Sequence, residues 1–216
     1  MNHGTLAGNT HINARIHELL REIHASDVAR FVRKFRGCSD KQCFHTFREL
    51  IPGAHLRRSG WDLRYERRFA GRTPDWVLVD DADHVLEIID VVTLHQRADT
   101  DLEIARKASS PGGWTGWVTT DPDRLFSKVA DKADVYASLS AEARVPYIVA
   151  LFAEFTAPIE PREMSHVLYD RHGGVFTGRP NMAGVIFFRE RFGQYVYNYF
   201  KNHESAVSST IVGGRD

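Results

Sequence analysis

Two stretches near the start of the chain carry apolar residues at helical spacing. Apolar positions three and four apart over residues 10–36 predict one amphipathic helix, which Gly37 is expected to end. Residues 43–58 predict a second helix, although Pro52 and Gly53 favour dividing it into two pieces. The chain therefore begins with helices that each have one face to bury.

The middle of the chain changes to strand patterns. Residues 61–67 alternate apolar and polar side chains, which predicts a strand with one solvent-facing side. The runs at 75–80 and 85–92 are continuously apolar, as in central strands that are covered on both faces. A helix is expected from Asp121 onward, and residues 146–152 predict another buried strand.

The last third predicts a short helix at Pro161–Tyr169 and a hairpin. The hairpin strands, 184–188 and 195–199, are joined through Gly193. Its free edge is a candidate surface for pairing with a second copy of the chain. We expect three parts: an N-terminal helical extension (1–40), an α/β core with the C-terminal hairpin (41–203), and a disordered Ser- and Gly-rich tail (204–216).

Composition limits the function classes only weakly. The 216 residues suffice for one domain with a sizeable core, and 43% hydrophobic with 26% charged residues is ordinary for a globular protein. The 28 basic and 28 acidic residues cancel, so no global field attracts polyanions and any such site must be local. No apolar run is long enough to span a bilayer, and with only two cysteines we expect a reduced, cytoplasmic protein.

Those two cysteines, Cys38 and Cys43, are too few for a disulfide framework. Together with His45 they are candidate zinc ligands, but their spacing is not that of a zinc finger and a fourth ligand is not evident.

Carboxylates interrupt the two central strands, where burying an unpaired charge is costly. Paired residues on antiparallel strands have numbers with a constant sum. A two-residue loop at 82–83 or a four-residue loop at 81–84 makes that sum 165, which places Asp75 opposite Asp90 on one face and Glu87 on the other. A three-residue loop or a β-bulge would favour Glu87 instead. Carboxylates that face each other in this way are suited to holding one divalent cation.

Pro74-Asp75 at the start of one strand and Asp90 on the next resemble the signature of the PD-(D/E)XK nuclease superfamily. The predicted order of helix, three strands, helix and strand over residues 44–155 resembles its core as well. The resemblance implies a restriction-endonuclease-like mixed sheet flanked by helices, with Mg²⁺ or Mn²⁺ held by Asp75 and Asp90, together with Glu49 or Glu87. One part of the signature is missing, because Val92 occupies the position of its lysine.

Other residues have to complete such a site. The resemblance makes Glu49, on the preceding helix, a third acidic candidate; an exposed glutamate paired with Arg48 is the alternative. Lys128 and Lys132 lie one turn apart on the predicted third helix, and the resemblance allows the lysine to come from such a helix. Lys132 is the preferred candidate and Lys107 a reserve.

Further candidates concern substrate binding. Six arginines precede the Pro-Asp motif and form a local basic patch: Arg57, Arg58, Arg64, Arg67, Arg68 and Arg72. They would hold a nucleic-acid backbone without reading its sequence, or simply be solvated. His95 is a candidate base or phosphate ligand, and Trp114 and Trp117 would stack bases or anchor a loop.

Two functions from different classes are consistent with these features. The first is a metal-dependent nuclease that hydrolyses phosphodiester bonds, with DNA as the expected substrate. The second is a catalytically degenerate member that binds nucleic acid or a protein, which Val92 and the zero net charge favour. An unrelated α/β domain with structural carboxylates is a third alternative.

Overall fold

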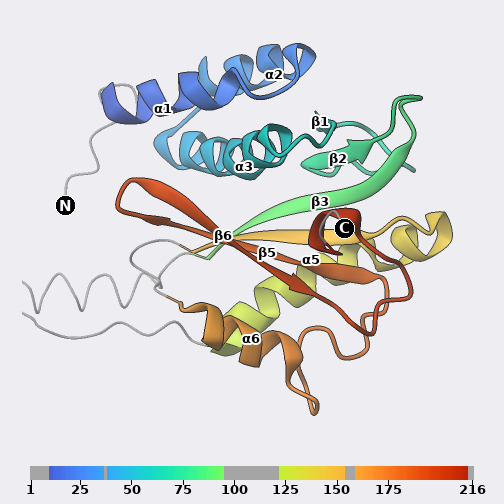
Figure 1. Cartoon of the computed structure of the whole chain (residues 1–216). Coiled ribbons are helices and arrows are strands. Elements are labelled where there is room, and N and C mark those ends of the chain that lie inside the picture. The colour runs from blue at the N-terminus through green and yellow to red at the C-terminus, as the bar shows by residue number, and fades with distance from the viewer. Residues whose placement is uncertain (1–9, 37, 95–121, 154–158, 214–216) are drawn as a thin grey trace, which may run out of the picture.

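The computed structural model describes residues 10–36, 38–94, 122–153 and 159–213. One mixed β-sheet lies between two layers of helices (Figure 1). In chain order the elements are α1 (Thr10–Leu20), α2 (Ala25–Arg36), α3 (Asp40–Arg58), β1 (Leu63–Tyr65), β2 (Trp76–Val79), β3 (Val85–Leu94), α5 (Pro122–Ala143), β4 (Tyr147–Ala153), α6 (Pro161–Tyr169), β5 (Met182–Arg191), β6 (Gln194–Lys201) and α7 (Thr210–Gly213). The prediction of an α/β protein with a mixed sheet flanked by helices is confirmed.

The six strands lie in chain order across the sheet. Strands β1, β2 and β3 are antiparallel neighbours, β3, β4 and β5 are parallel, and β6 returns antiparallel to β5. Parallel neighbours need a crossover, and α5 and α6 supply the two crossovers from β3 to β4 and from β4 to β5. The centre of the sheet is therefore covered on both faces, which explains the continuous apolar runs of its strands.

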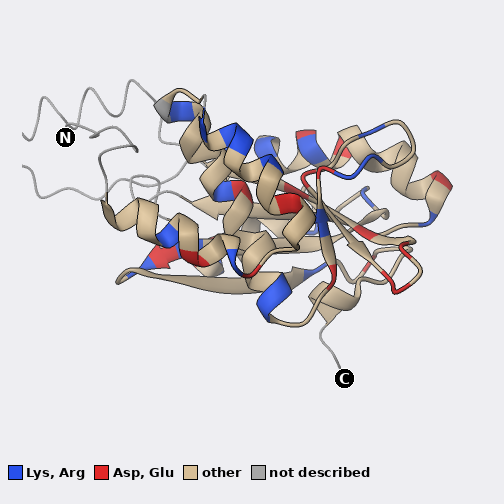
Figure 2. Ribbon diagram, turned by 90° about the horizontal axis from the view of Figure 1, so that it is seen from above, with Lys and Arg blue, Asp and Glu red and all other residues tan. Residues whose placement is uncertain are grey.

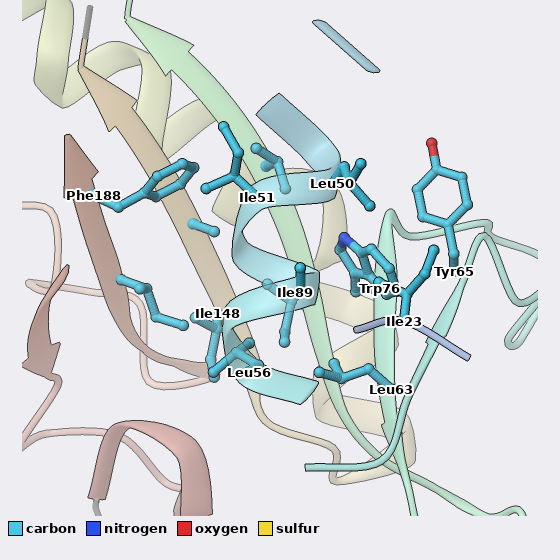
Figure 3. Close-up of a cluster of buried hydrophobic side chains, with 14 of the residues drawn as sticks. Ile23, Leu50, Ile51, Leu56, Leu63, Tyr65, Trp76, Ile89, Ile148 and Phe188 are labelled. Carbon is cyan, nitrogen blue, oxygen red and sulfur yellow. The ribbon is translucent and has the colours of Figure 1, made fainter. Parts of the chain in front are cut away.

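Each face of the sheet has its own hydrophobic core. One core packs α1, α2, α3 and α7 against side chains such as Trp76, Ile89 and Ile148 (Figure 3). The other packs α5 and α6 against the alternate positions, including Ile88 and Val149. The N-terminal helices thus share a core with the sheet.

Helix α3 approaches the sheet closely at Gly53. A side-chain carbon at this position would lie 2.0 Å from the Trp76 ring, so only glycine permits the contact. The neighbouring Pro52 does not divide the helix as expected, and α3 is continuous from Asp40 to Arg58. The Trp76 indole N–H donates to the Glu49 carbonyl at 2.8 Å and so fixes the start of β2 against this part of α3.

Two boundaries differ from the sequence prediction. The first predicted helix is two helices, α1 and α2, and the second has Asp27 in its first turn, where a negative charge suits the helix dipole. The predicted disordered tail contains α7, and its Ile211 and Val212 are buried in the core. A short apolar segment that follows many polar residues gives no periodic signal, which is why the prediction missed it.

The cysteine prediction also needs correction. Cys38 and Cys43 form a disulfide across the junction of α2 and α3, so the expected reduced thiols are not what the structure shows. Their sulfurs are bonded to each other and His45 contacts Glu49, which leaves no basis for a zinc site at these three residues. Among the residues described, no helix has both the length and the apolar character needed to cross a membrane.

Candidate active site

The register of the β2–β3 hairpin decides which carboxylates face each other. Trp76 pairs with Ile89 and Leu78 with Glu87, so the paired numbers sum to 165 and Asp75 lies opposite Asp90. The connection itself differs from the expected loops: five residues separate Val79 from Val85, and a β-bulge after Leu78 restores the register. The pairing of Asp75 with Asp90 is confirmed, although the loop lengths used to derive it were wrong.

Each of the two carboxylates accepts a hydrogen bond from a backbone N–H on the opposite side of the hairpin. The backbone N–H of Asp75 donates to Oδ1 of Asp90 at 3.1 Å, and the N–H of Val91 donates to Oδ2 of Asp75 at 2.7 Å. One oxygen of each carboxylate is thereby held by the sheet. These hydrogen bonds hold the two side chains next to each other at the start of β2.

Asp90 is buried on the side of the sheet covered by α5, where it meets donors from α5 and β4. The Tyr147 hydroxyl donates to Oδ2 of Asp90 at 3.3 Å, and Lys132 Nζ lies 3.7 Å from the same oxygen. The Tyr136 ring stacks on Tyr147 with ring centroids 4.9 Å apart. Burial, together with the Asp90 charge, raises the pKa of both tyrosines well above the usual range, so both hydroxyls remain donors.

The two candidate lysines of α5 have different positions. Lys132 is the one that reaches Asp90, with 40% of its side chain exposed. Lys128 is exposed one turn earlier on the same helix. The structure therefore brings the preferred lysine of the sequence prediction to Asp90.

Glu49 on α3 is buried and accepts several hydrogen bonds. Its Oε1 lies 2.8 Å from Nδ1 of His45, while its Oε2 receives the Tyr65 hydroxyl and lies 3.2 Å from Lys34 Nζ. Burial alone would raise the pKa of this carboxyl, but the bonds from His45 and Tyr65 and the Lys34 charge lower it below its usual value. The alternative of an exposed glutamate is wrong, since Glu49 is 5% exposed.

The pKa of the Asp75 carboxyl is displaced from its usual value. Burial and the negative charges of Asp90 and Glu49 raise its pKa to about 7, against the opposing effects of the Val91 N–H and Lys132. Asp75 does not ionise easily beside two other acids, because the site has too little positive charge to offset their repulsion. Perturbed titration of this kind is a feature of functional sites.

Glu87 does not belong to this group and has a structural role. It pairs with Leu78, so its side chain lies on the opposite face from Asp90. Its carboxylate accepts hydrogen bonds from the hydroxyl of Ser209 (2.7 Å) and from the backbone N–H groups of Thr210 (2.6 Å) and Ile211 (3.4 Å). Glu87 therefore lies apart from the pair of Asp75 and Asp90, and this buried acid caps α7.

Glu87→Gln is expected to lower the free energy of unfolding by about 1–3 kcal/mol, because glutamine loses the charge and presents a donor to the N–H groups of α7. Urea unfolding measures this effect, with Glu142→Gln on the exposed face of α5 as the matched control. Equal stability of the two variants would show that the Glu87 cap is not formed.

The predicted arginine patch is largely neutralised by neighbouring acids. Arg57 and Arg64 both pair with Asp62, Arg67 pairs with Asp83, and Arg58 pairs with Glu22 and Glu18. Figure 2 shows basic and acidic segments interspersed over the face of α1, α2 and α3. Arg68 and Arg72 are exposed, and the Arg72 charge is near enough to lower the pKa of Tyr136 against the larger effects that raise it.

Some candidates lie outside the described residues: His95, Lys107, Trp114 and Trp117. Sequence reasoning also missed the roles of Lys34, Tyr65 and Tyr147, which come from elements distant in the chain. The only indication of these roles in the sequence is that each polar side chain lies in or next to an otherwise apolar pattern.

Within the described ranges, no three His, Cys, Asp or Glu side chains form a ready-made metal-binding group. No family model, curated protein or solved structure matches the chain.

Proposed function

We propose that this chain is a Mg²⁺-dependent nuclease that hydrolyses phosphodiester bonds, with DNA as its substrate and Asp75, Asp90 and Lys132 at its centre. The observation that carries the proposal is the placement of Lys132 from α5 at 3.7 Å from Asp90, beside the Asp75 carboxylate. The chain lacks a lysine on β3 two residues after Asp90, and α5 supplies one to the same carboxylate.

The arrangement of the elements supports a PD-(D/E)XK-like core. Helix α3, the antiparallel β1, β2 and β3, the crossover helix α5 and the parallel β4 follow one another in the order of that core. Asp75 directly precedes β2 and Asp90 lies on β3, which resembles the placement in the superfamily signature. This likeness concerns the fold, and the chemistry is argued from the side chains.

The donor set fits magnesium better than a metal that needs an all-protein cage. Mg²⁺ is commonly held by one or two carboxylates, with waters and substrate phosphate oxygens completing its shell. Asp75 and Asp90 provide two carboxylates, and no hydrogen bond of the described residues engages Oδ1 of Asp75. Glu49 is given no metal in this proposal, and its carboxylate instead binds His45, Tyr65 and Lys34.

Each residue then has a defined role. Asp75 and Asp90 would hold the cation, which when bound would polarise the scissile phosphate and lower the pKa of a water ligand. Lys132 places a positive charge where negative charge develops on the phosphate oxygens. Tyr147 keeps the Asp90 carboxylate oriented through its hydrogen bond.

In this proposal fewer residues bind nucleic acid than the six arginines that the sequence suggested. Arg68 and Arg72 are exposed on the segment that leads into Asp75, and the Arg72 charge reaches Tyr136 at the site. The other four arginines are held in ion pairs. Arg68 and Arg72 are therefore the residues that we assign to the phosphate backbone.

A second candidate keeps this fold without hydrolysis, as a nucleic-acid or protein binding module. The observation that favours it is Val92, which is buried at 6% exposure where the signature has its lysine. The position of Lys132 is consistent with both candidates, because the buried Asp90 carboxylate needs a positive partner in either.

Purified protein incubated with single-stranded DNA, duplex DNA or RNA tests the proposal on a denaturing gel. We expect metal-dependent cleavage of DNA in Mg²⁺ or Mn²⁺ and none in EDTA, with Glu87→Gln as active as the wild type wherever it is folded. Binding of these nucleic acids without cleavage in either metal would support the second candidate.

A further inference from the structure

His45 on α3 has a hydrogen-bonding arrangement that the roles proposed for Asp75, Asp90 and Lys132 do not explain. It lies one helical turn before Glu49 on α3, with Nδ1 2.8 Å from Oε1 of Glu49. An ionised carboxylate only accepts hydrogen bonds, so Nδ1 carries the proton of this bond and Nε2 is left for another partner. The ring is thus anchored at one nitrogen and accessible at the other, with 55% of the side chain exposed.

The anchoring carboxylate is itself rigid. Glu49 is buried, and the Tyr65 hydroxyl and Lys34 hold its second oxygen. Its backbone carbonyl receives the Trp76 indole, which is the residue after Asp75. The same segment of α3 therefore fixes the position of His45 relative to the start of β2.

The charges around His45 favour its protonated form. The hydrogen bond to Glu49, followed by the charges of Glu49 and Asp75, raises its pKa, while partial burial and Arg48 act in the opposite direction. The Trp76 indole bonds this part of α3 to the residue that follows Asp75, so His45 lies one helical turn from a direct contact with the start of β2.

We propose that His45 is a further catalytic residue, the general acid that protonates the leaving sugar oxygen from Nε2. The inference rests on the proposed nuclease function and deepens it. Glu49 is then a positioning residue that orients the imidazole, as the carboxylate partner of a catalytic histidine does in other hydrolytic sites.

The step balances without a further reactant. The oxygen of a water molecule forms a bond to phosphorus and the bond from phosphorus to the sugar oxygen breaks. The electron pair of the broken bond stays on the sugar oxygen, which takes the proton from Nε2 of His45. The water releases one proton to solvent, and His45 regains one from solvent.

A substrate with a better leaving group isolates this proton transfer. Once the cleaved bond and the leaving oxygen are mapped on DNA, the same oligonucleotide is made with sulfur in place of that oxygen. A thiolate leaves without protonation, so it needs no general acid. Single-turnover rates are measured on both substrates for the wild type and for His45→Gln.

A matched control comes from the hairpin turn. His84 also contacts an acid through Nδ1, at 3.1 Å from Oδ2 of Asp80, and is 77% exposed. Asp80 and His84 flank the turn between β2 and β3, so His84→Gln removes a similar exposed pair that does not involve Asp75 or Glu49.

We expect His45→Gln to slow cleavage of ordinary DNA by about 100-fold or more, the usual contribution of a general acid, and to cleave the sulfur substrate within about threefold of the wild type. The loss of wild-type activity at high pH should also disappear in this variant. His84→Gln should match the wild type on both substrates.

Equal losses on the two substrates, or unchanged cleavage of DNA by a folded His45→Gln protein, would overturn the role of His45 while leaving the nuclease proposal intact. Failure of the wild type to cleave any nucleic acid would instead overturn the proposed function, and this inference with it. Thermal unfolding of each variant establishes that the protein compared is folded.

Discussion

Asp75→Asn is expected to abolish DNA cleavage and, in the same protein, to increase stability at pH 8. Removing a ligand of the proposed cation should cost at least about 1,000-fold in rate, equivalent to roughly 4 kcal/mol of transition-state stabilisation. The stability effect has the opposite sign because the carboxylate is unfavourable in the folded protein. A residue retained only for structure would not show this combination.

The sign follows from the titration of Asp75. Its pKa rises from the usual 3.8 to about 7 in the folded protein, chiefly through burial and the Asp90 charge. The stabilising contribution of the neutral form is thus fully present below pH 3.8 and is lost as the pH rises through about 7. At pH 8 the folded protein holds an unfavourable charge, and removing it should raise the free energy of unfolding by on the order of 2 kcal/mol.

Urea unfolding in EDTA measures this effect without interference from bound metal. The difference between Asp75→Asn and the wild type should be larger at pH 8 than at pH 5, where the wild-type carboxyl is already neutral. A variant that is less stable than the wild type at pH 8 would show that Asp75 is a structural acid held by the Val91 N–H.

Lys132→Ala is expected to slow cleavage by about 100- to 1,000-fold, whereas Lys128→Ala should remain near the wild-type rate. This loss is typical when one group that stabilises developing charge is removed. Both lysines lie on α5 one turn apart, so the two variants make the same chemical change on the same helix. Of these two lysines, Lys132 is the one that contacts Asp90.

Single-turnover rates at saturating enzyme separate the chemical step from DNA binding in this comparison. If the two lysines contributed only surface charge, both variants would lose DNA affinity to a similar extent, and this loss would depend on the salt concentration. Equal rates for the two variants would show that Lys132 does not replace the missing lysine of β3.

The sequence predicted the acidic pair for a physical reason that the structure confirms. Side chains alternate along a strand, so the register of one hairpin decides which carboxylates share a face, and Asp75 with Asp90 followed from that rule. The mechanism of the register was not predictable, because the bulge after Leu78 compensates for a loop of different length. Helix spacing likewise predicted that Lys128 and Lys132 share a face, and the preferred candidate, Lys132, is the one that reaches Asp90.

Long-range contacts account for what the sequence did not predict. The cap that Glu87 provides for α7 joins residues more than 120 positions apart, and nothing local distinguishes it from a metal ligand. Glu49 was expected near the site, but two of its partners, Lys34 and Tyr65, come from α2 and β1. Local patterns specified the elements, and tertiary packing decided the role of each buried acid.

The cleavage rate of wild-type protein and of Asp75→Asn on one DNA substrate in Mg²⁺ tests the central claim most directly. We expect cleavage by the wild type that EDTA stops and that folded Asp75→Asn loses by at least about 1,000-fold. Cleavage that persists in Asp75→Asn would contradict an active site built on the pair of Asp75 and Asp90.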